Sequence, residues 1–194
     1  MLKINTIEKL SHLSFDIKTF LKLYPWKNCK PSKSQSPHKK LNESKVAIIS
    51  SAGLFIQNKQ EPFDSTIKGG DCSFRIIPSN INMDELSESH RSKTFDHSGI
   101  RSNPSTAMPI PQLDDLVGEG FIGSINNRHF SFMGSIINTR DLIYDSIPKI
   151  ISMLTEDKVD IVLFIPINSN AFIAIDNISV SIFKPLIYLN SNYV

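Results

Sequence analysis

Two continuous runs of apolar residues constrain this chain more than any other feature. They are residues 46–49, which lead into the small residues 50–53, and residues 161–165, which follow Asp160. A strand with one wet face alternates apolar and polar residues, whereas a run that is apolar throughout is typical of a strand buried on both faces. Such strands belong to parallel sheets that helices cover. The two runs therefore predict an α/β fold.

Strand and helix signals alternate along the rest of the chain. Pro148 suits the first turn of a helix capped by Asp145 or Ser146, and apolar residues follow it at helical spacing. The other expected elements are strands at 73–78, 121–125 and 184–189, a helical turn at 84–89, a short helix at 112–117 and a weak helix at 170–182. This alternation predicts a mainly parallel, Rossmann-like sheet with flanking helices.

A separate segment precedes this domain. Residues 1–26 carry apolar side chains at three- and four-residue steps and are expected to form an amphipathic helix that Pro25 closes. Residues 27–44 are rich in lysine, serine and proline and poor in apolar residues, which predicts a basic linker. The α/β domain is then expected to cover residues 45–194.

Composition excludes several classes of protein. The 21 basic and 19 acidic residues give a net charge of +2, which is too small for a nucleic-acid binder. The two cysteines, Cys29 and Cys72, are too few for a disulfide scaffold and lack the CxxC spacing of a metal or redox pair, so no metal is expected. No apolar stretch approaches the ~20 residues that span a bilayer, and no signal peptide is evident. We therefore expect a cytoplasmic protein without membrane contact.

Polar residues in four loops are the candidates for a binding site, because ligands of α/β sheets bind at the carboxyl ends of strands. The loops hold Asp71 (with Arg75 in the strand that follows), Asp96 and His97, Arg128 and His129, and residues 166–170. Each has a structural alternative. His129 could be bonded to backbone, Asp96 could form an ordinary turn, and Arg75 could belong to a structural ion pair.

Several motifs, in order, resemble the glycine/sarcosine/betaine/D-proline reductase selenoprotein family, in particular selenoprotein B and the selenocysteine subunit of D-proline reductase. They are Val46-Ala-Ile-Ile-Ser-Ser-Ala-Gly53, Gly70-Asp-Cys-Ser-Phe-Arg-Ile-Ile-Pro78, Asp96-His97-Ser98, residues 109–124 and Arg128-His-Phe-Ser-Phe-Met-Gly134. The resemblance runs from about residue 45 to about residue 190. It implies a subunit that reductively cleaves a C–N bond of an amino-acid-like substrate by attack of a selenolate or thiolate. It also implies a partner subunit, which in the D-proline branch carries a pyruvoyl group, and no cofactor on this chain.

The sequence departs from the family where the redox residues belong. Asn168 and Ala171 occupy the positions of the selenocysteine/cysteine pair, and no cysteine lies between residues 73 and 194. Neither side chain is a nucleophile. Cys72 is the other thiol in the matched region, and we interpret it as a small buried apolar residue. Family members also continue beyond the last expected strand, which predicts a shortened C-terminus.

Three functional hypotheses follow. In the first, the chain is a reductase-family member that is redox-inactive by itself, in which Asp71, Arg75, Asp96 and Arg128 bind the substrate and His97 and His129 move protons. In the second, it is a non-catalytic binding or assembly subunit, with a partner subunit or a second copy of itself. In the third, it is a truncated pseudo-enzyme.

Trypsin tests the expected linker. We predict rapid cleavage between Lys27 and Lys45, because a segment poor in apolar residues is weakly protected by packing. Mass spectrometry of the digest should show a stable fragment that begins near residue 45. Protection of this segment while sites in the remainder of the chain are cut would contradict the domain boundary.

Overall fold

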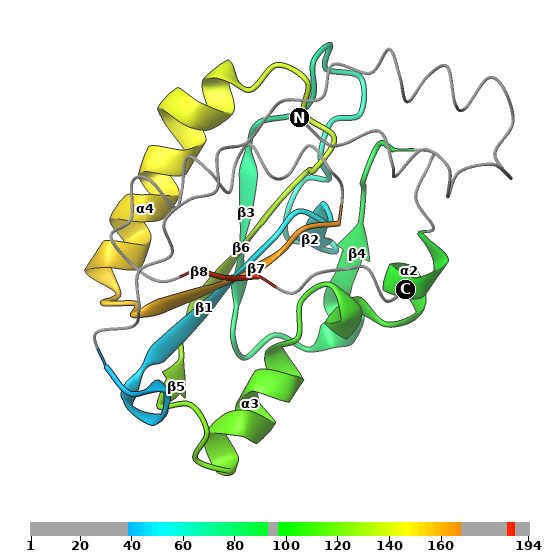
Figure 1. Ribbon diagram of the computed structural model, residues 1–194. Coiled ribbons are helices and arrows are strands. Elements are labelled where there is room, and N and C mark those ends of the chain that lie inside the picture. The colour runs from blue at the N-terminus through cyan, green and yellow to red at the C-terminus, as the bar shows by residue number, and fades with distance from the viewer. Residues whose placement is uncertain (1–38, 93–96, 168–185, 189–194) are drawn as a thin grey trace, which may run out of the picture. The chain divides into compact units, whose positions relative to one another are not determined.

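The fold is organised around β1 (Lys45–Ser50), which lies inside a six-stranded sheet in the computed structural model (Figure 1). The structure describes residues 39–92, 97–167 and 186–188. The strand order is β3-β6-β1-β7-β8, and β5 also pairs with β1. The remaining strands of this sheet are β3 (Phe74–Pro78), β5 (Ser124–Ile125), β6 (Arg128–Phe132), β7 (Ile161–Ile165) and β8 (Leu186–Tyr188).

Strand direction confirms the α/β class but makes the sheet mixed. β1 pairs in parallel with β5, β6 and β7, and β7 pairs in parallel with β8. β3, in contrast, pairs antiparallel with β6. A parallel neighbour needs a crossover, usually a helix, that carries the chain back to the opposite edge. No helix lies between β1 and β3, so the chain stays at the carboxyl edge and β3 runs in the reverse direction.

A second, two-stranded sheet extends from the end of β1. It consists of β2 (Leu54–Ile56) and β4 (Leu86–Glu88), which pair antiparallel. The 3-10 turn η4 (Met83–Glu85) precedes β4, so the helical turn expected at 84–89 is wrong beyond its first residues. Residues 86–88 are extended because their backbone pairs with β2, a long-range partner that local sequence does not reveal.

The helices lie as the apolar spacing indicated, with changed ends. The helix predicted at 112–117 is α3 (Ile110–Gly118), and the one expected after residue 146 is α4 (Ile147–Glu156), with Pro148 in its first turn. Ser146 does not cap α4, because its hydroxyl donates to the Cys72 carbonyl oxygen (2.6 Å). The other helical segments among the described residues are η3 (Leu41–Glu43), α2 (Ser98–Ser102), η5 (Pro104–Thr106) and the π-helical turn η6 (Leu142–Ser146).

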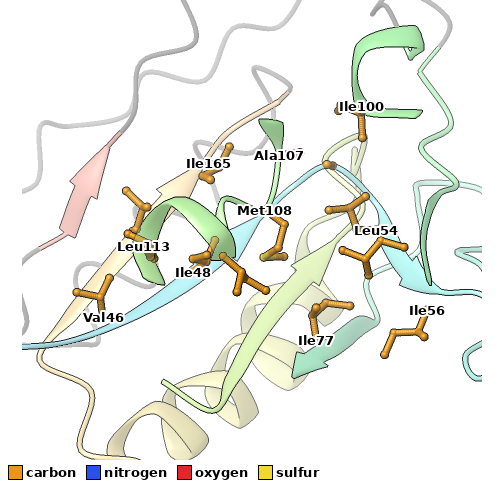
Figure 2. Close-up of a cluster of buried hydrophobic side chains, with 14 of the residues drawn as sticks. Val46, Ile48, Leu54, Ile56, Ile77, Ile100, Ala107, Met108, Leu113 and Ile165 are labelled. Carbon is orange, nitrogen blue, oxygen red and sulfur yellow. The ribbon is translucent and has the colours of Figure 1, made fainter. Parts of the chain in front are cut away.

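Two apolar clusters bury β1 from both sides. Ala47 and Ile49 belong to the cluster that contains α4 residues such as Ile150 and Leu154. Val46 and Ile48 belong to the other, which also contains residues of α2 and α3 (Figure 2). Successive strand residues point to opposite faces, so a strand covered on both faces must be apolar at every position. The central interpretation of residues 46–49 and 161–165 is confirmed.

The expectations for the two ends of the chain can be compared with the structure only in part. The strand expected at 184–189 is confirmed as β8, whereas the helices expected at 1–26 and 170–182 lie outside the described residues. By residue contacts the chain divides into two units, 1–31 and 32–194. The described end of the expected linker contains η3 and the fully buried Ser44. No helix among the described residues is long and apolar enough to cross a membrane.

Gly70 tests how tightly the loop before β3 is packed. Its φ is +103°, and an added Cβ would lie 2.8 Å from the Ser135 carbonyl oxygen. Gly70→Ala should therefore lower the free energy of unfolding by roughly 1–3 kcal/mol. Urea denaturation measures the change. Gly118→Ala is the matched control, because a Cβ there meets nothing within 4 Å and the helix gains from alanine. Equal stability of both variants would contradict this packing.

Candidate functional site

The carboxyl ends of β1, β6 and β7 meet at one edge of the sheet. Ser51 joins two of them, because its hydroxyl oxygen accepts a hydrogen bond from the Ile167 amide (2.8 Å). Gly134, just after β6, allows the closest approach. A Cβ at Gly134 would lie 2.8 Å from the Ser51 carbonyl oxygen and 3.2 Å from His90 Nε2. The strand ends therefore pack directly against His90, which follows β4.

A buried carboxylate organises the polar residues beside this edge. The Glu88 side chain is 1% exposed and accepts a short hydrogen bond from the His90 amide. Its Oε2 lies 2.9 Å from His97 Nδ1 and 3.1 Å from Arg101 Nε. The other ring nitrogen of His97 lies 2.6 Å from the Ser92 carbonyl oxygen. We call Glu88, His90, His97 and Arg101 the Glu88 group.

His97 is the one expected site residue that lies in the Glu88 group. The sequence pattern does not predict Glu88, His90 or Arg101 as site residues, because it places residues 86–88 in a helical turn and not at the end of a strand. Burial lowers the pKa of His90 to about 4, although the neighbouring carboxylate opposes the shift. His90 is therefore an uncharged imidazole at neutral pH. A strand at 86–88 would have directed attention to the polar residues that follow it.

Asp71 and Arg75 lie near the carboxyl edge but bind the chain's own groups. Asp71 accepts hydrogen bonds from the Ser73 amide (2.8 Å), the Ser73 hydroxyl (2.5 Å) and the Asp64 amide (3.0 Å). Burial raises the pKa of Asp71, but these hydrogen bonds outweigh it, and the pKa lies below its usual value. Arg75 Nε donates to the Glu61 carbonyl oxygen (2.8 Å). The two side chains thus hold the loop before β3 in place.

Arg128 is not at this edge, so the expectation that it joins Asp71 and Arg75 is wrong. It is the first residue of β6 and lies opposite Pro78, the last residue of the antiparallel β3, at the amino edge of the parallel strands. Arg128 Nε donates to Asp157 Oδ2 (2.7 Å) and Nη2 to Glu156 Oε2 (2.8 Å). Hydrogen bonds from Arg128 hold the pKa of Asp157 below its usual value. This guanidinium connects β6 to the end of α4.

His129 lies inside β6 and not in a loop, as the structural alternative anticipated. The side chain is fully buried, and Nδ1 accepts a hydrogen bond from the Ile48 amide (3.1 Å). β1 pairs with β5 up to Val46 and with β6 from Ile49. The imidazole ring therefore binds the Ile48 amide in the gap between these two strand pairings. Since Nδ1 accepts, the proton of the neutral ring is on Nε2, which has no partner among the described residues. Burial lowers the pKa of His129 to about 4.

Cys72 packs against the edge of the apolar cluster that contains the α4 residues Ile150 and Leu154, as expected of a small apolar residue. Burial raises its pKa, so the thiol stays protonated at neutral pH. Asp96, Asn168 and Ala171 lie outside the described residues. Within the described part of the chain, no three His, Cys, Asp or Glu side chains are grouped to hold a metal ion.

The fold and this edge define a mixed α/β protein with a charged, partly exposed group beside the ends of its central strands. Over 125 residues the sequence is 28% identical to D-proline reductase subunit gamma of Acetoanaerobium sticklandii. The matched stretch covers 64% of this chain. The chain spans about half, 49%, of that relative's length. The similarity supports a relation to the D-proline reductase family. No family model matches the chain, and no solved structure matches it.

Acid should destabilise the protein through its buried imidazoles. The folded-state pKa of His129 lies below the ordinary 6.5, so its contribution to stability is complete above pH 6.5 and is lost as the pH falls toward 4. We expect a loss on the order of 2 kcal/mol from about pH 7 to about pH 5. Urea denaturation at both values measures it. His129→Asn keeps an acceptor for the Ile48 amide without a titrating ring and should reduce this dependence. An unchanged pH dependence would contradict a neutral, buried His129.

Proposed function

We propose that this chain is a subunit of a reductase-family complex acting on an amino-acid-like substrate, and that it has no redox activity by itself. The observation that carries the proposal is the 28% identity to a D-proline reductase subunit. The shared stretch is long enough to include most of the described α/β domain. The proposal assigns to this chain the role of one component among several, with the reactive groups supplied by a partner.

The chemistry of the reaction supports the second half of the proposal. Reductive opening of D-proline breaks the bond between nitrogen and the alpha carbon and adds two electrons and two protons, giving 5-aminovalerate. A dithiol, or a thiol and a selenol, supplies both and becomes oxidised. This chain contains only Cys29 and Cys72, and the pKa of the Cys72 thiol is raised by burial. Asn168 and Ala171 stand where the resemblance places the reactive pair, and neither can act as a nucleophile.

Exposed apolar side chains support a protein partner. Ile137 and Tyr144, on the segment between β6 and α4, are 70% and 77% exposed. Ile67 is also exposed, and the adjoining loop joins this segment because the Gly69 carbonyl oxygen accepts hydrogen bonds from the amides of Ile137 and Asn138. Large apolar side chains grouped on a surface are typical of protein interfaces. In this proposal a reductase-family partner covers them.

Two measurements test the proposal. The purified chain with dithiothreitol should not form 5-aminovalerate from D-proline, nor release the corresponding amine from glycine, sarcosine or betaine, above the rate without enzyme. The tagged full-length chain, expressed in its native host, should co-purify with a reductase-family subunit that carries a thiol or selenol pair, identified by mass spectrometry.

Surface variants make the capture experiment specific. Ile137→Asp and Tyr144→Ser should reduce recovery of the partner, because each removes exposed apolar surface from the proposed interface. Phe121→Ser is the matched control, since Phe121 is 59% exposed but follows α3. Turnover by the chain alone, or the absence of any reductase-family protein from the captured material, would overturn the proposal.

A further inference from the structure

Arg101 differs from the other arginines in how its guanidinium is held. The chain has five arginines, and all lie in the described ranges. Arg75 donates to its own loop through Nε and both Nη atoms, and Arg128 donates to Asp157 and Glu156. Arg101 is 64% exposed, and its Nε is fixed on the buried Glu88. Neither Nη atom of Arg101 makes a hydrogen bond within the part of the chain that the structure describes.

Anchoring at Nε leaves one defined binding edge on Arg101. A guanidinium presents five N–H groups in a rigid plane, and the two Nη atoms together form a fork that matches the two oxygens of a carboxylate. Because Glu88 Oε2 occupies Nε, the end of the plane that bears both Nη atoms faces away from that contact. Glu88 itself has a nearly inaccessible side chain, so it restricts the orientation of the guanidinium without competing for solvent-side ligands.

The contacts of His97 and Glu88 hold the positively charged guanidinium in one place. His97 Nε2 lies 2.6 Å from the Ser92 carbonyl oxygen, and its Nδ1 lies 2.9 Å from Glu88 Oε2. The same carboxylate oxygen accepts the hydrogen bond from Arg101 Nε (3.1 Å). A guanidinium does not lose its proton in proteins, so Arg101 presents a permanent positive charge at this position.

The position of Arg101 suits a ligand at the edge of the sheet. Arg101 belongs to α2, and its neighbour Ile100 is buried in the same cluster as Leu54 and Ile165 (Figure 2). The Ser89 amide donates to the Gly53 carbonyl oxygen (3.0 Å), which brings the end of β4 to the end of β1. Figure 1 shows α2 close to β4. Arg101 is thus held beside the carboxyl ends of the central strands.

We propose that Arg101 binds the carboxylate of a small amino-acid-like ligand through its two Nη atoms, with Glu88 and His97 as positioning residues. The carboxylate follows from the exposed fork and the positive charge; the amino-acid class of the ligand rests on the proposed function. Paired N–H···O bonds to a carboxylate are among the stronger hydrogen bonds in proteins. This role replaces the one expected for Arg128, whose guanidinium is occupied by Asp157 and Glu156.

Isothermal titration calorimetry of the full-length chain tests this binding. D-proline, glycine and betaine are the probes, and D-prolinamide, which lacks the carboxylate, is the control ligand. We expect the wild type to bind at least one probe and to bind D-prolinamide at least tenfold more weakly than D-proline. Arg101→Ala should weaken binding at least tenfold. Arg101→Lys should also weaken it, because an ammonium keeps the charge but lacks the planar fork.

Arg140→Ala is the matched control, since Arg140 is an exposed arginine outside the Glu88 group. This variant should bind the probes with the same affinity as the wild type. Unfolding midpoints confirm that each variant is folded; if Arg101→Ala is not, Arg101→Lys decides. Unchanged affinity in the folded Arg101 variants, equal binding of D-prolinamide, or no binding of any probe by the wild type would overturn the role of Arg101. These results leave partner capture unaffected, whereas failure of capture with Arg101-dependent binding would overturn only the subunit role.

Discussion

The burial of β1 on both faces is the constraint on which the rest of the structure depends. Val46 and Ile48 enter one apolar cluster and Ala47 and Ile49 the other, so neither face of the strand can be left uncovered. Its neighbours β6 and β7 run in parallel with it, as is common for strands covered on both faces, and end at the same edge. The close packing of Ser51, Gly134 and His90 at that edge follows from this arrangement.

The return of the chain after β1 decides which polar residues come together. Without a crossover helix, the chain reaches β3 from the carboxyl edge and runs back along β6. Asp71 and Arg75 consequently lie near the carboxyl edge, where they stabilise a loop, and Arg128 lies at the other end of β6, where it binds α4. The Glu88 group forms because β4 pairs with β2 and ends beside β1.

The polar residues beside the carboxyl edge and the described thiol have different surroundings. The carboxyl edge carries a buried carboxylate, a histidine bonded at both ring nitrogens and an exposed guanidinium, which together suit recognition of an anion. The described thiol, Cys72, packs against the apolar cluster that contains α4 residues, and burial raises its pKa, so it is protonated at neutral pH. The proposed function therefore assigns the nucleophile to a partner subunit, and the similarity to one subunit of D-proline reductase supports a relation to that family.

The sequence by itself determined the elements whose signal is local. Continuous apolar runs specified β1 and β7, and helical spacing specified α3 and α4, because burial on given faces imposes those periods. Tertiary structure alone decided the direction of β3, the strand at 86–88 and the hydrogen-bond partners of each polar side chain. Whether Arg128 or Arg101 keeps an available fork depends on which carboxylates lie within hydrogen-bond distance, and those carboxylates are distant in sequence: Asp157 is 29 residues from Arg128, and Glu88 is 13 from Arg101.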